Sequence, residues 1–410
     1  MTRELNKVPA GWQKVNFEDM ADLVTDRIDD PKESGLKDYI GLDHIDTDNI
    51  RIKRFGSTND VEATKFLCKK GDIIFGKRNA YLRKVAVSDR AAVVSAHSMV
   101  LRSKDSKVIS DFLPCFMQSS IFWKTAQAIS EGSMSPTIKW KTLASQEFWI
   151  PSLPEQKKIS EILWSIENNL EKTERLLAVT EIIKNGLLEH LLTKGIGHKK
   201  FKKTEIGEIP AQWTTYEFAR AIEINPARKL TLNNEYTKIE MSDLQEWNPK
   251  VLDSRKALFK GGGSKFKNGD TLLARITPCL ENGKTAFIDM LDDNELAFGS
   301  TEFIVLSGKK DLTLDKYVYY TCILSQFRLL AADSMIGTSG RQRVPKSFFD
   351  NLSIPLPPVS EQKIIVEILD TFSRTCATCR AIIQNTKNVK MKLTNSFLSG
   401  ELLIPKEALK

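Results

Sequence analysis

Basic side chains gather in two stretches of the chain, and their chemistry suits a polyanion. Residues 65–90 contain eight Lys or Arg residues against two acids, which gives a local net charge of +6. Residues 255–284 contain seven basic residues against two acids, and the whole chain carries a net charge of +8. A matched basic region in each half predicts a surface that binds a polyanion, such as a nucleic acid. The alternative is chance clustering of solvated side chains.

Within and near these stretches lie side chains that can read DNA bases. Arginine suits guanine, and asparagine or glutamine suits adenine, in the major groove. The candidates for DNA binding in the first half are Lys77, Arg78, Asn79, Tyr81, Arg83, Lys84, Lys139 and Lys141. Those in the second half are Arg275, Lys284, Arg341, Gln342, Arg343 and Lys346. Each could also be a surface side chain without contacts, and Arg275, at the end of a predicted strand, could be a structural ion-pair partner.

Catalytic motifs are not recognisable in the sequence. Asn225-Pro226 and Asn248-Pro249 stop short of the Asn-Pro-Pro-Tyr type of motif used in methyl transfer to amino groups. Gly283-Lys284-Thr285 resembles the end of a phosphate-binding loop, but Pro278 stands where that motif needs glycine. The four histidines form no metal or triad pattern, and Cys376 and Cys379 lack a second pair. We therefore expect a non-catalytic, DNA-binding chain without a metal or cofactor of its own.

A boundary motif occurs twice. Ile150-Pro151 leads to Glu155-Gln156-Lys157, and Ile354-Pro355 leads to Glu361-Gln362-Lys363, which begins 206 residues later (361 − 155). The segment Val8-Pro9-Ala10-Gly11-Trp12 is likewise matched by Ile209-Pro210-Ala211-Gln212-Trp213. Such repetition indicates a tandem duplication of one structural unit.

Each half reads as a strand-rich globular part followed by a long helix. Short apolar or β-branched runs predict strands at 72–75, 84–87, 91–95, 271–274, 285–288 and 302–306. Apolar residues at helical spacing predict shorter helices over 108–129 and 317–330, and long helices over about 154–192 and 361–398, with Ser360 as the N-cap of the last. A helix of about 40 residues is about 60 Å long.

The apolar stripe of each long helix needs a partner, and we expect that partner to be the other helix, in antiparallel orientation. The alternative is that each helix packs on its own globular part. The predicted fold class is therefore α+β, a pseudo-twofold tandem repeat with two globular domains separated by a coiled-coil spacer. The predicted segments are 1–152, 153–196, a flexible basic linker at 197–204, 205–357, 358–400 and a tail at 401–410.

The chain is expected to be cytoplasmic. It has no run of 18 apolar residues, and its first residues lack the apolar stretch of a signal peptide.

The duplicated boundary, together with Gly71-Asp-Ile-Ile-Phe-Gly-Lys-Arg and the run from Gly269 to Lys284, resembles the specificity subunit of type I restriction–modification enzymes. The resemblance covers nearly the whole chain, because it also includes Gly299-Ser-Thr-Glu-Phe and the Gly337-Thr338 segment that precedes Arg341. Cys376, Thr378 and Cys379 depart from the apolar pattern of the first long helix, which puts the symmetry of the helix pair in doubt.

That resemblance implies two target-recognition domains, each reading one half of a bipartite double-stranded DNA sequence. It implies that the helices set the spacing and dock modification subunits, of which two are expected, and that restriction/translocase subunits join the complex. S-adenosylmethionine, ATP and Mg are then expected on the partner subunits. The alternatives are a self-contained DNA methyltransferase or nuclease with diverged motifs, and a coiled-coil protein scaffold.

Overall fold

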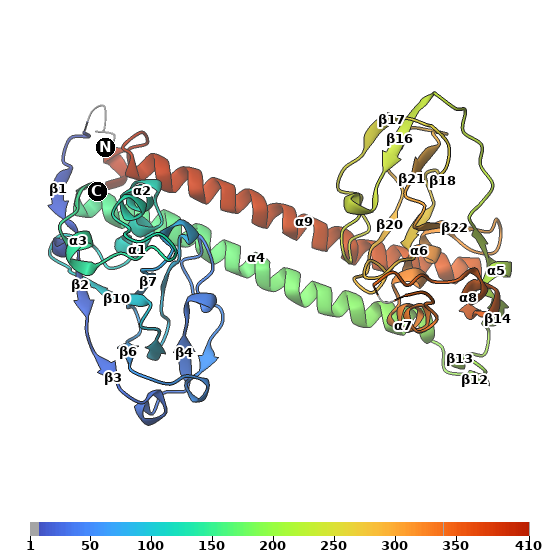
Figure 1. The fold of residues 1–410 in the computed structure, drawn as a ribbon, viewed down its shortest axis with the longest axis horizontal. Helices are drawn as coiled ribbons and strands as arrows, with labels where there is room; N and C mark the ends of the chain where they lie inside the picture. Colours follow the sequence, from blue (N-terminus) through green and yellow to red (C-terminus); the bar gives the residue numbers. More distant parts are fainter. Residues whose placement is uncertain (1–7, 339, 410) are drawn as a thin grey trace. The chain divides into compact units, whose positions relative to one another are not determined.

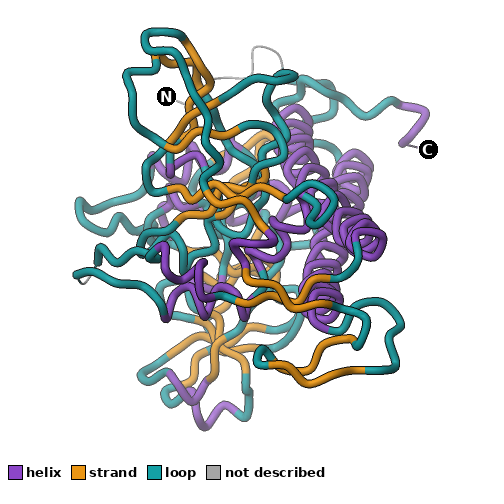
Figure 2. The backbone as a smooth tube through the Cα atoms, turned by 90° about the vertical axis from the view of Figure 1, so that its right-hand side faces the viewer, coloured by secondary structure: helices purple, strands orange, loops and turns teal. Residues whose placement is uncertain are grey.

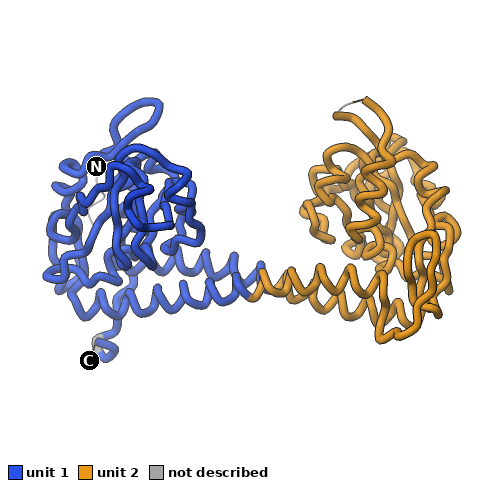
Figure 3. The backbone as a smooth tube through the Cα atoms, turned by 90° about the horizontal axis from the view of Figure 1, so that it is seen from below, with its two compact units in different colours: residues 1–175, 379–410 blue, residues 176–378 orange. Residues whose placement is uncertain are grey.

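The computed structural model describes residues 8–338 and 340–409. It divides into two compact units, residues 1–175 with 379–410 and residues 176–378 (Figure 3). Two long helices, α4 (Leu153–Thr193) and α9 (Val359–Leu398), run through both units (Figure 1). Each unit therefore contains one globular part and a segment of each long helix. The bounds of α4 and α9 agree with the predicted helices within two residues.

Short strands joined by loops make up the globular parts of both units (Figure 2). One four-stranded sheet has the order β2 (Ala21–Val24), β10 (Ser98–Ser103), β7 (Ile73–Gly76) and β8 (Val85–Val87). A five-stranded sheet has the order β3 (Arg27–Ile28), β6 (Lys65–Cys68), β9 (Ala92–Val94), β4 (Asp38–Ile40) and β5 (Gly56–Ser57). A separate two-stranded sheet is formed by β1 (Gln13–Asn16) and β11 (Glu147–Ile150).

The helices of the first globular part are α1 (Phe112–Met117), α2 (Ser120–Ala128) and α3 (Trp140–Ala144). The single helix predicted over 108–129 is wrong, because Ser119 adopts an extended conformation and its side chain caps α2 by accepting from the Phe122 N–H. Aromatic side chains fill the core beneath the sheet; Phe75 and Phe148, for example, both lie within 6.2 Å of Phe122, measured between ring centroids. Burial of such large apolar surfaces is the main stabilising contribution to this part.

The second globular part repeats this plan. Its first sheet has the order β15 (Ile222–Ile224), β22 (Phe303–Gly308), β19 (Thr271–Ala274) and β20 (Thr285–Phe287). Its second sheet has the order β17 (Arg255–Leu258), β16 (Glu235–Ile239), β21 (Ala297–Gly299) and β18 (Ser264–Phe266), and β14 (Thr214–Glu217) pairs with β23 (Ser353–Leu356). The helices are α5 (Phe218–Ala221), α6 (Asp315–Ile323), α7 (Ser325–Asp333) and α8 (Lys346–Asn351). The predicted helix over 317–330 is divided, because Leu324 is extended.

The strand registers show that the sequence duplication is a structural one. Ile73 lies opposite Leu101 and Val87 in the first unit, and Thr271 lies opposite Leu306 and Phe287 in the second. β7 and β19 therefore occupy the same place in the two sheets.

Two local predictions need correction. The basic segment 197–204 is not a flexible connector throughout, because β12 (Phe201–Thr204) pairs with β13 (Gly207–Pro210) in a hairpin. The Lys202 ammonium donates to the Trp213 carbonyl at 2.5 Å, which fixes the hairpin to the second unit. Ser360 does not cap the last helix, because α9 begins one residue earlier, at Val359.

Within each unit the segments of α4 and α9 lie together. In the first unit, Glu167 of α4 pairs with Lys390 of α9 at 2.6 Å, and Glu174 pairs with Lys387 at 3.5 Å. The partner number falls as the α4 number rises, so these two segments are antiparallel. In the second unit, Leu188, Leu191 and Leu192 share a core with Ile365 and Leu369. No helix in the described part of the chain has the length and apolarity needed to cross a membrane.

The glutamine of the duplicated Glu-Gln-Lys motif joins each long helix to its globular part. The Gln156 carbonyl oxygen accepts from the Ile109 N–H at 3.0 Å, and its amide donates to the carbonyls of Lys107 and Pro151. Gln362 repeats the three bonds with Leu314, Leu312 and Pro357, at 2.9, 2.8 and 2.9 Å. Both side chains are fully buried.

Candidate nucleic-acid interface

In the first unit, the loop after β7 is hydrogen-bonded to the segment that follows α2. The Ile138 N–H donates to the Lys77 carbonyl at 2.9 Å, and the Asn79 N–H donates to the Pro136 carbonyl at 2.8 Å. Thr137 and Glu131 exchange both of their backbone bonds, at 2.8 and 3.1 Å. We call residues 77–84 and 131–141 the first loop pair. The structure therefore brings together the two groups of candidate residues that the sequence separates.

The second unit makes the same arrangement after β19. The Val344 N–H donates to the Arg275 carbonyl at 2.9 Å, and the Thr277 N–H donates to the Gln342 carbonyl at 3.0 Å. Arg343 and Ile336 exchange both backbone bonds, at 2.9 and 3.0 Å. We call residues 275–284 and 336–346, apart from Ser339, the second loop pair. Main-chain bonds form the same frame in both loop pairs, and in the second loop pair Glu302 also contacts an arginine from each of its two segments.

Several candidate side chains of the first loop pair are bound within the protein. Arg83 Nε lies 2.8 Å from Asp48 Oδ1, and the Lys84 ammonium donates to the Leu42 carbonyl. Lys139 pairs with Glu131 at 2.7 Å.

The remaining candidates differ in their exposure. Tyr81 is 62% exposed, and Lys141 is also exposed. Arg78 Nη1 lies 3.4 Å from His97 Nε2. Asn79 has a left-handed backbone, and its Oδ1 is buried without a hydrogen-bond partner among the described residues.

In the second loop pair, Glu302 holds two of the candidate arginines. Arg343 Nε lies 3.0 Å from both carboxylate oxygens, and its Nη2 lies 2.7 Å from Oε1. Arg275 Nε lies 3.9 Å from the same carboxylate, which agrees with the ion-pair alternative for this residue. The hydrogen bond from Arg343 is the largest cause that lowers the pKa of Glu302. Glu302 thus stays ionised and fixes the Arg343 guanidinium.

The other candidates of the second loop pair are likewise either bound within the protein or accessible to solvent. The Lys284 ammonium donates to the Met241 carbonyl at 2.9 Å, as Lys84 does to Leu42. Arg341 and Lys346 are exposed, and Gln342 is half-buried. Arg341, Gln342 and Lys346 are therefore the candidates best placed to meet a ligand.

In each unit the structure shows a supporting loop that contacts the loop pair and that the sequence did not predict. The Asp48 N–H donates to the Arg83 carbonyl at 3.4 Å, and the Trp247 N–H donates to the Gly283 carbonyl at 3.3 Å. Asp48 and Trp247 both have positive φ, at 56° and 55°. A Cβ on Gly283 would lie 2.4 Å from the Trp247 indole, so glycine is required there. The equivalence of these loops depends on strand register, which local sequence patterns do not reveal.

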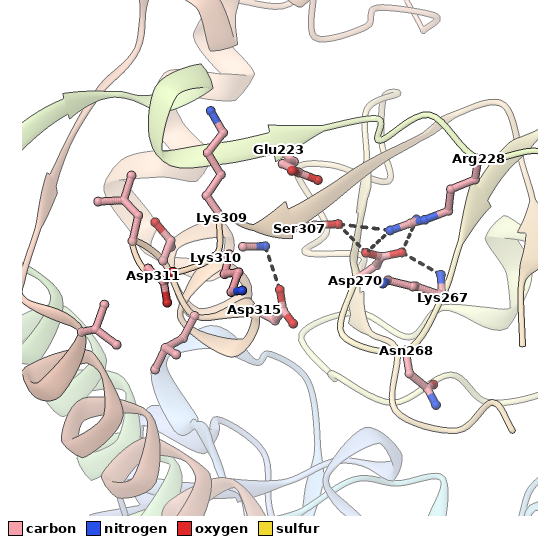
Figure 4. Close-up of a pocket in the computed structure, with 15 residues that line it drawn as sticks. Glu223, Arg228, Lys267, Asn268, Asp270, Ser307, Lys309, Lys310, Asp311 and Asp315 are labelled. Atoms are coloured by element: carbon pink, nitrogen blue, oxygen red, sulfur yellow. Dashed lines mark hydrogen bonds and ion pairs between the residues drawn. The ribbon is translucent and has the colours of Figure 1, made fainter. Parts of the chain in front are cut away.

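A polar cavity of about 370 Å³ lies in the second unit (Figure 4). Arg228 donates to both carboxylate oxygens of Asp270, and Ser307 and the Lys267 N–H donate to the same carboxylate. Asp270 is thus fully engaged by protein donors. Among the described residues, no three His, Cys, Asp or Glu side chains form a group that could hold a metal ion. Cys376 and Cys379 are buried and form no disulfide within the described part of the chain.

Comparisons with known proteins point to one family. A family model described as the type I restriction modification DNA specificity domain matches residues 9–181 and 197–388. The putative type I restriction enzyme MjaX specificity subunit of Methanocaldococcus jannaschii is 24% identical over 98% of this chain and 96% of its own length. The MjaVIII specificity subunit of the same organism is 22% identical over 97% and 94%.

Solved structures share the fold. The S subunit of a type I restriction-modification system from M. genitalium aligns with a TM-score of 0.61 at 12% identity, over 96% of this chain and 97% of that one. A chain from a study of assembly and conformational transition in a type I restriction-modification system aligns with a TM-score of 0.54 at 18% identity, over 97% and 100%.

Proposed function

This chain belongs to the type I restriction–modification DNA specificity family, and we propose that it is the DNA-recognition subunit of such a complex. Each globular part reads one half of a bipartite target. The observation that carries this proposal is the repeated loop pair, which presents basic and amide side chains at the same sheet position in both units. The relatives named above are specificity subunits, so the alternatives of a self-contained enzyme or a coiled-coil scaffold are not favoured.

Base and phosphate contacts fall to different side chains in this proposal. Arg341 and Gln342 stand at the turn of the second loop pair and have the hydrogen-bonding groups that discriminate guanine and adenine. Lys346 and Lys141 carry compact charges suited to phosphate oxygens, which position the duplex without reading it. Arg343, held by Glu302, acts first as a support for Arg341, whose carbonyl accepts from Arg343 Nη1 at 3.2 Å.

The two long helices form the antiparallel coiled-coil spacer and dock the modification subunits, of which we expect two. In the second unit, α4 exposes a run of aliphatic side chains, Leu176, Val179, Ile182 and Ile183, and Ile182 is 72% exposed. An exposed aliphatic run on a helix suits a protein partner. The chain itself carries no catalysis. S-adenosylmethionine, ATP and Mg²⁺ would be bound by the modification and restriction/translocase subunits.

Mapping the methylated motifs of the host genome tests this function. We expect a bipartite motif with an unread gap to disappear when the gene is deleted. A host that carries Arg341→Ala with Gln342→Ala should relax only the half-site read by the second unit. A methylation pattern that is unchanged by deletion would refute the proposed function.

A further inference from the structure

Five basic side chains gather at the edge of the first loop pair, and two of them, Lys77 and Arg78, belong to it. Arg27 of β3 lies opposite Phe66 of β6, with its guanidinium carbon 5.1 Å from the centre of that ring. The Lys77 ammonium lies 6.0 Å from the same ring centre. Lys65 acts electrostatically on His97, and His97 contacts Arg78 as described above. We call these residues the cation cluster; they are Arg27, Lys65, Lys77, Arg78 and His97.

The cation cluster lacks counter-charges. In the part of the chain that the structure describes, none of its five members forms an ion pair with a carboxylate; Lys65 Nζ donates instead to backbone carbonyls, including that of Ala63 at 3.1 Å. Burial, then Arg78 and Arg27, lower the pKa of Lys77. Burial, then Arg78, Lys77 and Lys65, lower the pKa of His97. The repulsion between like charges that lie close together is reduced when an anion binds.

The second unit uses the position of Arg27 differently. Leu23 lies opposite Leu101 in the first unit, and Ile224 lies opposite Leu306 in the second, so Leu23 and Ile224 occupy equivalent positions. Arg27 and Arg228 each lie four residues after these positions and are therefore equivalent to each other. The guanidinium of Arg228 is engaged in the ion pair with Asp270 (Figure 4). In the first unit the matching carboxylate, Asp72, is instead held by Arg102 through two bonds of 2.7 Å. That exchange leaves Arg27 available to a ligand.

His97 has an acidic counterpart, Glu302, in the second unit. The Lys77 N–H donates to the His97 carbonyl at 3.2 Å, and the equivalent bond runs from Arg275 to the Glu302 carbonyl at 3.0 Å. Glu302 neutralises the arginines of the second loop pair, whereas His97 brings no negative charge to the first and becomes positive when it is protonated. The shared scaffold therefore does not require an uncompensated positive surface at this place, because Glu302 compensates the charge at the equivalent place in the second unit.

We propose that the cation cluster is a phosphate-binding site that holds the DNA backbone beside the first loop pair, with His97 as its protonatable member. This inference rests on the proposed function and deepens it by assigning Arg27, Lys65 and His97. A bound phosphate favours protonated His97, so affinity rises as the pH falls through the range where His97 titrates. The charged groups that face His97 are Arg78, Lys77 and Lys65, which stay cationic over that range.

Salt-dependent DNA binding tests the site. The full-length chain is titrated with a fluorescent duplex of mixed sequence over a series of salt concentrations. Each lost phosphate contact reduces the slope of log K against log salt by about 0.9, so Arg27→Ala with Lys65→Ala should reduce it by about 1.8. The matched control, Lys37→Ala with Lys124→Ala, removes two exposed cations of the same unit that lie outside the cluster.

The outcomes separate the two proposals. If the wild-type chain does not bind the duplex at any salt concentration, the proposed function fails. If it binds and the two double variants have equal slopes, only the cation cluster fails. Wild-type affinity should also rise between about pH 8 and pH 5, and His97→Gln should lose most of that rise. A pH response that is the same in His97→Gln would remove His97 from the site.

A second titration identifies the source of the phosphate. Inorganic pyrophosphate should compete with the duplex only as far as its ionic strength predicts. If pyrophosphate displaces the duplex from the wild-type chain at concentrations where sulfate of equal ionic strength does not, the site takes small anions and its assignment to the DNA backbone is wrong.

Discussion

Replacing Gln362 by methionine should destabilise the second unit by about 3 kcal/mol. The substitution keeps the length of the side chain but removes its three hydrogen bonds to Leu314, Leu312 and Pro357. Each buried backbone group left without a partner costs about 1–3 kcal/mol, and part of that cost is recovered because the methionine is itself apolar. The loss should be concentrated at the junction between α9 and the loop before α6.

Urea unfolding monitored by circular dichroism provides the measurement. With a denaturant dependence of about 2 kcal/mol/M, a loss of 3 kcal/mol lowers the midpoint of the affected transition by about 1.5 M. Gln156→Met should produce the same loss in the first unit, because Gln156 makes the same three bonds. Observing both changes would show that the duplicated motif has one structural role in both units.

The matched control is Gln384→Met. Gln384 lies on the same helix and is exposed, and among the described residues its side chain donates to the side chain of Asn388 at 3.3 Å. Glutamine and methionine have similar helix propensities, so this change should cost less than about 0.5 kcal/mol. If Gln362→Met cost no more than Gln384→Met, the buried side chain would not join the helix to the globular part as we argue.

Three further predictions concern the interface and the helices. Arg341→Ala should weaken binding of the specific duplex by about 1–3 kcal/mol in a gel titration, and an unchanged affinity and sequence preference would remove Arg341 from the reading side chains. Because Arg343 lowers the pKa of Glu302, the ion pair should stabilise the second unit above the unfolded pKa of about 4.3 and cease to do so as the pH falls through the lower folded value. The difference in unfolding free energy between wild type and Glu302→Gln should thus be about 1–2 kcal/mol at pH 7 and vanish in acid, and a difference that persists in acid would contradict the ion-pair explanation. Ile182→Lys should abolish co-purification with a modification subunit while changing stability by less than about 0.5 kcal/mol, and retention equal to that of Asn169→Lys, an exposed control on the same helix, would exclude this surface.

The elements that the sequence predicts best have long or regular patterns. The apolar stripes of α4 and α9 continue over 41 and 40 residues, and the bounds of β19 agree with the predicted strand. The divided helices were harder to predict because Ser119 and Leu324 interrupt patterns that otherwise continue.

The candidate site was predictable in its residue types but not in its pairing. Arg343 and Lys139 are basic in the sequence, yet only the fold shows that Glu302 and Glu131 hold them. The role of Arg27 depends on which arginine holds the buried carboxylate of its unit. Arg102 holds Asp72 in the first unit, whereas Arg228, the counterpart of Arg27, holds Asp270 in the second, and this difference follows from strand register. Long-range pairing of this kind has no local signature in one sequence.

The main-chain construction of the loop pairs bears on how such a protein diversifies. Arg78 and Thr137 in the first unit stand where Ile276 and Arg343 stand in the second, on the same hydrogen-bonded frame. A mutation at Arg78 or Ile276 leaves the main-chain bonds of the frame in place, whereas a mutation at Arg343 also removes side-chain bonds to Glu302 and to the Arg341 carbonyl. New sequence preferences can therefore arise by single substitutions in one half of the molecule, without a compensating change in the other.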